Sequence, residues 1–219
     1  MPSNEAGARG KSRPSPRERL LKAADELFYA EGINSVGIDR VIERAEVARA
    51  SLYSAFGSKD ELIRAYLERR MQQSQARLRA AVEAHDDPRD RLLSVFGVQA
   101  AAFARPGYQG CAFNRASAEA PPGSAAYEVP RAYRAWLHGF FRDLAATAGA
   151  AEPGLLASQM HLLYDGAMLA ASVDRNAGVT VASRSAAEAL LDAALPGPAA
   201  HPGAGGRHRR QHAEPAAVG

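Results

Sequence analysis

The residues with the clearest chemical capacity lie in a short segment near position 50. Ala50, Ser51 and Ser54 are small, and they directly follow a cation, Arg49. The major groove of DNA is about 12 Å wide and admits one α-helix, and short side chains at the start of that helix let it approach the base edges. Because the net charge of the chain is only +3, a nucleic-acid contact must depend on locally placed cations. This segment is therefore a candidate for nucleic-acid recognition.

Two short helices must present this segment. Apolar residues recur at spacings of three and four from Ile38 to Ala45, which predicts a helix over 38–45. A break follows at 46–48, and a second helix is expected over 49–56, closed by Gly57. Apolar residues on both sides of the break can hold the two helices at a steep angle. This is helix-turn-helix geometry, in which the second helix enters the major groove.

Helix start and stop signals recur along the rest of the chain. Ser15 with Glu18 predicts a helix that ends at Gly32, and Ser58 with Glu61 opens a long helix to about residue 84. Further helices are expected near 88–105, 111–120, 127–148, 152–174 and 182–195. No sustained alternation of apolar and polar residues indicates a strand. The prediction is an all-α fold of about nine helices, with Gly178 in a loop.

The chain has 219 residues, of which 47% are hydrophobic and 23% charged. That is enough chain for a substantial core. No stretch reaches the ~18 apolar residues of a membrane span, and the start has no apolar signal segment. We therefore expect a cytoplasmic protein without a membrane partner. Residues 1–14 are basic, residues 196–219 are rich in Pro, Gly and Arg, and both are expected to be disordered tails.

The 17–67 region resembles the TetR/AcrR family of bacterial transcriptional repressors. The resemblance rests on Leu27-Phe28 with Gly32, the segment 38–45, Leu52-Tyr53 with Phe56, and Ser58-Lys59 with Leu62. Three positions depart from the family pattern. Glu46 replaces the usual turn glycine, Ala48 replaces the Ser or Thr that caps the second helix, and Gly37 replaces a hydroxyl residue.

The resemblance implies that the partner is a double-stranded DNA operator. Arg49 and the short residues after it would face base edges, while Tyr53 and Lys59 would reach phosphates. Arg40 and Arg44 would clamp the DNA backbone or would simply be solvated. The candidate DNA-binding residues are thus Arg40, Arg44, Arg49, Ala50, Ser51, Tyr53, Ser54 and Lys59.

The resemblance also implies a DNA-binding domain over 15–58 and a domain over 59–195 that binds an inducer and dimerises. Large apolar side chains are concentrated in the second region, and a pocket between helices is the usual ligand site of such bundles. For any one aromatic residue, a place in the core is the alternative to ligand contact. The candidate ligand-binding residues are Phe96, Gln99, Phe103, Cys111, Asn114, Trp136, Met160 and Tyr164.

Cys111 is the one cysteine and excludes an intramolecular disulfide. With Arg115 one turn away it is either a reactive thiol or a small buried apolar residue. His138 and His161 lack the close spacing of metal ligands, so no metal site and no cofactor are expected. Catalysis would depend on Cys111 with one of these histidines. Because no nucleophile or phosphate-loop motif is present, we expect a protein that is not an enzyme.

Small and apolar residues on the last two helices predict a homodimer that closes through a four-helix interface. The predicted surface includes Leu155, Leu156, Gln159, Leu162, Leu163, Ala170, Ala171, Ala186, Ala189, Leu190, Ala193 and Ala194. The function expected from these features is that of a repressor released from a palindromic operator by a small apolar inducer. Two alternatives remain: a redox or electrophile sensor that acts through Cys111, and, more remotely, an enzyme.

Overall fold

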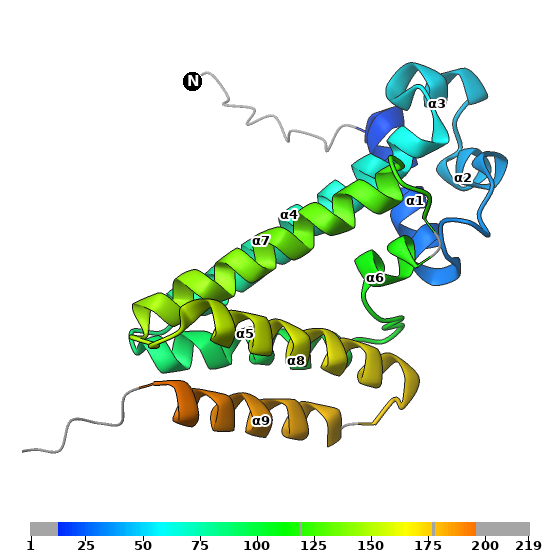
Figure 1. Cartoon of the computed structure of the whole chain (residues 1–219). Helices are drawn as coiled ribbons and strands as arrows, with labels where there is room; N and C mark the ends of the chain where they lie inside the picture. The colour runs from blue at the N-terminus through cyan, green and yellow to red at the C-terminus, as the bar shows by residue number, and fades with distance from the viewer. Residues whose placement is uncertain (1–12, 119, 177, 196–219) are drawn as a thin grey trace, which may run out of the picture.

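The computed structural model describes residues 13–118, 120–176 and 178–195, and in these ranges the chain forms nine α-helices and no strand (Figure 1). The helices are α1 (Pro16–Glu31), α2 (Ile38–Ala45), α3 (Arg49–Phe56), α4 (Lys59–Glu83), α5 (Pro88–Phe103), α6 (Ala112–Ser117), α7 (Ala125–Thr147), α8 (Pro153–Val173) and α9 (Gly178–Ala194). The all-α prediction is confirmed. Of the two predicted tails only Arg13 and Pro14 are described, and the remainder lies outside the described residues.

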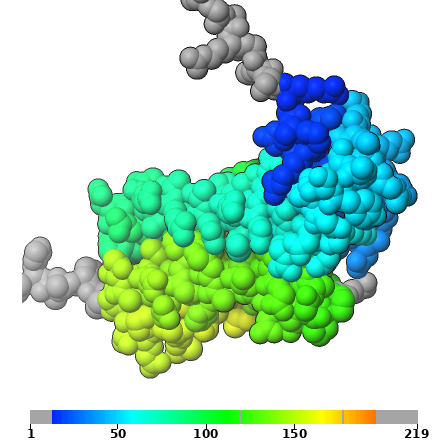
Figure 2. Space-filling view, turned by 90° about the horizontal axis from the view of Figure 1, so that it is seen from above, coloured from blue at the N-terminus to red at the C-terminus, as the bar shows by residue number. Residues whose placement is uncertain are grey.

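The helices divide between the two ends of the molecule. The first three form an N-terminal unit (α1–α3) at one end, and α4 leads away from it alongside α7 (Figure 1). At the other end α5, α7, α8 and α9 pack on one another. Figure 2 shows the same division from above, with the N-terminal unit at one end and α4 lying beside α7 in the rest of the molecule.

Local capping explains where several helices begin. The Ser15 hydroxyl accepts a hydrogen bond from the Glu18 N–H at 3.2 Å, and the Glu18 carboxylate accepts one from the Ser15 N–H at 2.7 Å. The Ser58 hydroxyl accepts from the Glu61 N–H at 3.1 Å and so caps α4. These bonds satisfy backbone donors that a helix start leaves unpaired. Both predicted starts are confirmed.

The core of the N-terminal unit extends into α4. Leu20, Phe28 and Leu52 are buried, and the Phe28 ring meets the Tyr66 ring edge-on at a centroid distance of 5.5 Å. Leu62 of α4 is also fully buried. The first turns of α4 therefore complete the core of the N-terminal unit.

The turn between α2 and α3 has a left-handed residue that is not glycine. Glu46 has φ 53° and ψ 50°, a conformation that costs an L-residue roughly 1–2 kcal/mol. The Arg19 guanidinium donates hydrogen bonds to the carbonyl oxygens of Ala45 at 3.2 Å and Glu46 at 2.9 Å. Arg19 therefore pairs carbonyls at the C-terminal end of α2, at the turn where glycine is absent.

Some helix bounds differ from those expected. Gly178, predicted to lie in a loop, is the first residue of α9, because its N–H donates to the Asn176 side-chain oxygen at 2.8 Å and is thereby capped. The helix expected over 111–120 is the shorter α6, with Cys111 at its N-cap position.

Candidate nucleic-acid interface and central cavity

α3 has one buried face and one open face. Leu52 is fully buried and Phe56 is half-buried against the core of the N-terminal unit. The predicted base-reading and phosphate residues of α3 are on its accessible surface: Arg49, Ala50, Tyr53 and Ser54 are exposed, and Ser51 is half-exposed. The polar side chains are thus free to meet a groove while the apolar ones hold the helix in place.

The three candidate arginines each have a carboxylate partner. Arg44 lies 2.7 Å from Glu26, Arg40 pairs with Glu31, and Arg49 pairs with Asp39. All three arginine side chains are more than half exposed, so these pairs contribute little to stability. Each pair can therefore be exchanged for a contact with a phosphate at small cost.

Lys59 occupies the first position of α4, directly after the Ser58 cap. Its side chain is half-buried, and this burial lowers the pKa of Lys59. Among the described residues Lys59 forms no ion pair. A lysine at a helix N-terminus adds its charge to the positive end of the helix dipole, a combination that favours a bound anion.

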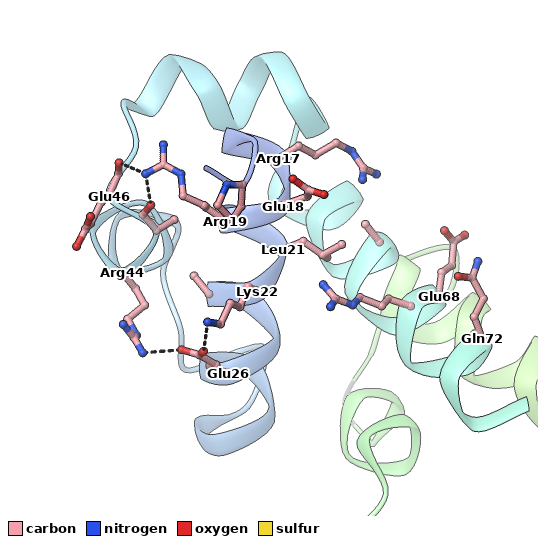
Figure 3. A pocket seen from close by; sticks show the side chains of 15 residues that line it. Arg17, Glu18, Arg19, Leu21, Lys22, Glu26, Arg44, Glu46, Glu68 and Gln72 are labelled. Carbon is pink, nitrogen blue, oxygen red and sulfur yellow. Dashed lines mark hydrogen bonds and ion pairs between the residues drawn. The ribbon is translucent and has the colours of Figure 1, made fainter. Parts of the chain in front are cut away.

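A wide surface cleft of about 850 Å³ is lined by α1, the end of α2 and α4 (Figure 3). Both signs of charge line it: Lys22 and Arg44 each contact Glu26, and Glu68 faces the cleft from α4. The cleft is open to solvent, and its charges are largely compensated. It lacks the apolar enclosure typical of small-molecule sites.

A second hollow, the central cavity, has a volume of about 340 Å³ and lies between α4, α5, α6, α7 and α8. Tyr29 of α1 also lines it. Its walls combine aromatic, apolar and charged side chains: Asp25, Tyr29, Arg70, Gln73, Ser74, Arg77, Val98, Gln99, Ala102, Arg105, Pro106, Gly107, Tyr108, Gly110, Cys111, Ala112, Phe113, Tyr133, Tyr164 and Met168.

Three of the eight candidate ligand-binding residues, Gln99, Cys111 and Tyr164, line this cavity. The other five do not. Phe96 and Met160 are buried in the core, and Phe103 lines a separate hollow of about 420 Å³ beside Tyr108. Asn114 is partly buried on α6, and Trp136 stacks on Phe140 at 5.0 Å. These five residues share no cavity with the other three, so their contacts with a ligand remain predictions.

The cavity wall contains residues that sequence reasoning missed. Asp25 and Tyr29 lie on the first helix, within the range that the sequence predicts to be the DNA-binding domain, and Arg70 and Arg77 lie seven residues apart on α4. A spacing of seven places two side chains on the same face of a helix. That spacing was visible in the sequence, but which helices would meet that face was not.

Asp25, Tyr29, Arg70 and Gly110 form what we call the α1 junction. Arg70 donates to both carboxylate oxygens of Asp25, at 2.8 and 3.2 Å, and its guanidinium lies 3.9 Å from the centre of the Tyr29 ring. The Tyr29 hydroxyl donates to the Gly110 carbonyl at 3.1 Å and accepts from the Gln109 N–H at 3.0 Å. The junction thus connects α1 with α4 and with the loop before α6, and all four of its residues line the cavity.

Cys111 faces the same cavity but is poorly suited to form a thiolate. Burial raises its pKa, and the N–H groups of Asn114 and Phe113 oppose this only in part. His161 is buried with its Nε2 3.6 Å from an Asp165 oxygen, and burial lowers the pKa of His161. Within the described ranges no group of three or more His, Cys, Asp and Glu side chains could hold a metal ion.

α8 and α9 present an apolar surface to solvent. Leu155, Leu162 and Leu169 recur every seven residues along α8 and are 53%, 70% and 64% exposed. Val173 on α8 and Val181 on α9 are exposed as well. Two residues predicted for this surface, Leu156 and Ala171, instead pack inside the chain. No helix in the described ranges is both long and apolar enough to span a membrane.

The chain is similar to known bacterial transcriptional regulators. Residues 20–66 match the family model described as bacterial regulatory proteins, tetR family. The solved structure of SCO4454, a TetR-family transcriptional regulator from Streptomyces coelicolor, is 33% identical with a TM-score of 0.79, and the match covers 82% of this chain and 95% of that one. The protein sav143 from Streptomyces avermitilis is 35% identical with a TM-score of 0.71, over 83% of this chain and 98% of that one.

Curated relatives match over shorter stretches. The HTH-type transcriptional activator FasR of Mycolicibacterium smegmatis is 35% identical over 103 residues, which are 41% of this chain and 47% of that protein. The HTH-type transcriptional repressor NemR of Escherichia coli is 30% identical over 105 residues, 47% of this chain and 53% of that protein. The chain therefore matches only about half the length of these curated relatives.

Proposed function

The chain belongs to the TetR family of bacterial transcriptional regulators, and from this premise we propose that it is a homodimeric repressor that leaves a palindromic operator when a small molecule fills the central cavity. DNA binding follows from the family. We propose, in addition, that the protein represses transcription, that it responds to a ligand, and that single residues have the roles given below. The curated relatives include one named activator and one named repressor, so the sign of regulation needs its own test.

In this proposal α3 lies in the major groove. Arg49 and Ser51 contact base edges, while Ala50 and Ser54 let the helix approach closely. Tyr53 and Lys59 bind phosphates, and Arg40 and Arg44 exchange their carboxylate partners for the DNA backbone. The exposure of the α3 side chains around the buried Leu52 supports this orientation.

The observation that carries the proposed ligand response is that α1 forms part of the cavity wall. A molecule in the cavity contacts Asp25 and Tyr29 directly, and these residues also belong to the α1 junction. A ligand that binds better when this junction is rearranged shifts α1, and with it α3, away from the DNA-bound arrangement. The shift is limited by the difference in ligand affinity between the two arrangements, typically ~1–3 kcal/mol.

A second link connects the first turn of α4 with the start of α7. The Asp60 carboxylate, in the first turn of α4, accepts hydrogen bonds at 3.1 and 3.2 Å from the Ala125 N–H at the start of α7. α7 contributes Tyr133 to the cavity wall. A ligand that displaces α7 therefore acts on α4 at its N-terminal end as well as in the middle.

The proposed dimer closes through α8 and α9. Exposed leucines repeated every seven residues form one continuous row along a helix, which is suited to pack against a second copy around a two-fold axis. Such a dimer would place two α3 helices at half-sites ~34–36 Å apart. An interface that aligned the two copies differently could not serve a palindromic operator.

The experiment begins with DNA that adjoins the gene of this chain. Fluorescence anisotropy and footprinting should reveal one protected site with two symmetric halves, and a random duplex of equal length serves as control. A reporter driven by that site should become more active when the regulator is deleted. Equal binding to both duplexes would refute the assignment of α3, and reduced reporter activity would refute repression.

Redox sensing through Cys111 is the second candidate, because this thiol faces the cavity. Its raised pKa works against it, since the thiolate is the reactive form. Cys111→Ser discriminates between the two. Loss of operator release by peroxide, with release by a cavity ligand retained, would favour the sensor.

A further inference from the structure

Two arginines at the central cavity pair with no carboxylate among the described residues. Arg77 of α4 and Arg105, just after α5, both line the cavity, and within the described residues neither forms an ion pair. The acidic residue in the lining is Asp25, and Arg70 already binds both of its oxygens. The described lining of the cavity therefore has an excess of positive charge, contributed by what we call the arginine pair, Arg77 and Arg105.

The two members of the pair line the same cavity, and both are exposed to solvent. Burial lowers the pKa of Arg77, and the charge of Arg105 lowers it further. Arginine nevertheless remains charged at neutral pH, so this repulsion persists in the empty cavity. An anion between the two side chains would reduce this repulsion and accept charge-assisted hydrogen bonds from both guanidinium groups.

A buried amide supplies an independent sign that the cavity is built for a ligand. Gln99 lines it and is only 1% exposed. Its Nε2 donates to the Tyr164 carbonyl at 2.7 Å, which fixes the orientation of the amide, and its Oε1 has no hydrogen-bond partner within the described residues. An unpaired buried acceptor costs free energy, and a donor group brought by a ligand would remove that cost.

The remaining walls suit an apolar, flat body. The Phe113 and Tyr133 rings stack at a centroid distance of 4.1 Å, and Val98 and Met168 also line the cavity. The Tyr133 hydroxyl is already paired with the Ser74 hydroxyl at 2.9 Å, and the Tyr108 hydroxyl donates to the Met168 carbonyl at 3.2 Å. These tyrosines therefore present mainly their rings to an occupant.

We propose that the central cavity binds an amphipathic organic anion, whose carboxylate or similar acidic group lies between Arg77 and Arg105 and whose apolar body lies against the aromatic wall. This proposal names the class of ligand for the proposed function. The effect of the anion on DNA rests on the proposed function, whereas binding of the anion does not. It also replaces the purely apolar inducer expected from the sequence. A neutral apolar molecule would gain no ion pair with these two exposed arginines, and a cation would be repelled.

The test uses two fluorescent probes that differ by one charged group. 8-Anilinonaphthalene-1-sulfonate is an anion with a flat apolar body, and N-phenyl-1-naphthylamine is the same molecule without the sulfonate. The double variant Arg77→Gln/Arg105→Gln should bind the sulfonate at least tenfold more weakly and the neutral amine within twofold of wild type. The retained binding of the amine shows that the cavity is intact.

Arg79→Gln provides the matched control. Arg79 lies on α4 two residues from Arg77, outside the cavity lining, with its guanidinium over the Trp136 ring at 5.5 Å. Its replacement should leave the affinity for the sulfonate within twofold. In wild type, 2-naphthoate should displace the sulfonate, whereas methyl 2-naphthoate should not do so at the same concentration.

Equal affinity of wild type and the double variant for the sulfonate would overturn the anion site. Displacement by the ester as effective as by the acid would overturn it too. These measurements contain no DNA, so they are separate from the proposed function. If 2-naphthoate binds through the arginine pair but saturating amounts leave the operator complex intact, the site stands and the ligand response fails. Release of the operator by the ester alone would support the response and refute the anion.

Discussion

At the scale of single residues, Glu46 occupies a backbone conformation that glycine adopts at no steric cost. The side chain is exposed, so the strain is not repaid by packing, and Arg19 instead stabilises the turn by bonding the carbonyl oxygens of Ala45 and Glu46. The sequence predicts the turn and shows directly that Glu46 stands where glycine is usual. It did not predict Arg19, because a partner 27 positions away depends on how α1 and α2 pack.

Glu46→Gly should stabilise the chain by about 0.5–1 kcal/mol. Relief of a left-handed strain of about 1–2 kcal/mol exceeds the added entropy of the unfolded chain, about 0.4–1 kcal/mol. Urea denaturation of the two proteins measures the difference. Glu46→Ala removes the same side chain but keeps the strain, so it should show no gain, and equal stabilisation by both variants would refute backbone strain as the cause.

Lys59→Ala should weaken binding to every DNA sequence alike and reduce the slope of log affinity against log salt by about one. The reason is that the variant loses one contact with a phosphate, while no contact with a base is lost. Anisotropy titrations on operator and random duplexes at several salt concentrations provide the measurement. Arg142→Ala removes one exposed charge near the far end of α7 and should change neither quantity. A loss confined to the operator would mean that Lys59 reads bases.

At the scale of elements, the helices themselves were predictable because their start and stop signals are local. Ser15 with Glu18 and Ser58 with Glu61 form the caps that their spacing indicates. The cavity was not predictable in the same way. Its wall is assembled from several helices, and apolar periodicity does not determine which face of α1 meets which face of α4.

Tyr29→Phe should loosen the contact between α1 and the loop that precedes α6. The variant keeps the ring beside Arg70 but loses the hydrogen bonds to the Gly110 carbonyl and from the Gln109 N–H. Hydrogen exchange should therefore become faster at residues 105–111. Tyr127→Phe, which loses a hydroxyl bonded to Arg131, should leave that loop unchanged. Unchanged exchange in both variants would show that the junction does not restrain the loop.

At the scale of the whole molecule, the exposed row of leucines on α8 predicts that DNA binding depends on assembly. Leu162 is 70% exposed, so Leu162→Glu leaves the fold of one chain intact but places a charge in the proposed interface. Light scattering should show a monomer, and affinity for the operator should fall at least tenfold. Ala146→Glu, on the exposed surface of α7, should remain dimeric. A Leu162→Glu protein that stays dimeric would place the interface elsewhere.

The presence of Asp25 and Tyr29 in the cavity wall has a consequence for protein engineering. A chimera that joined residues 1–58 of this chain to the effector-binding helices of a relative would lack matching side chains on one side of its pocket. Such a graft would keep its operator preference yet respond poorly to the donor's effector. Replacing Asp25 and Tyr29 in the chimera by the donor's residues at the matching positions should restore the response, because in the proposed function the small molecule also contacts the first helix.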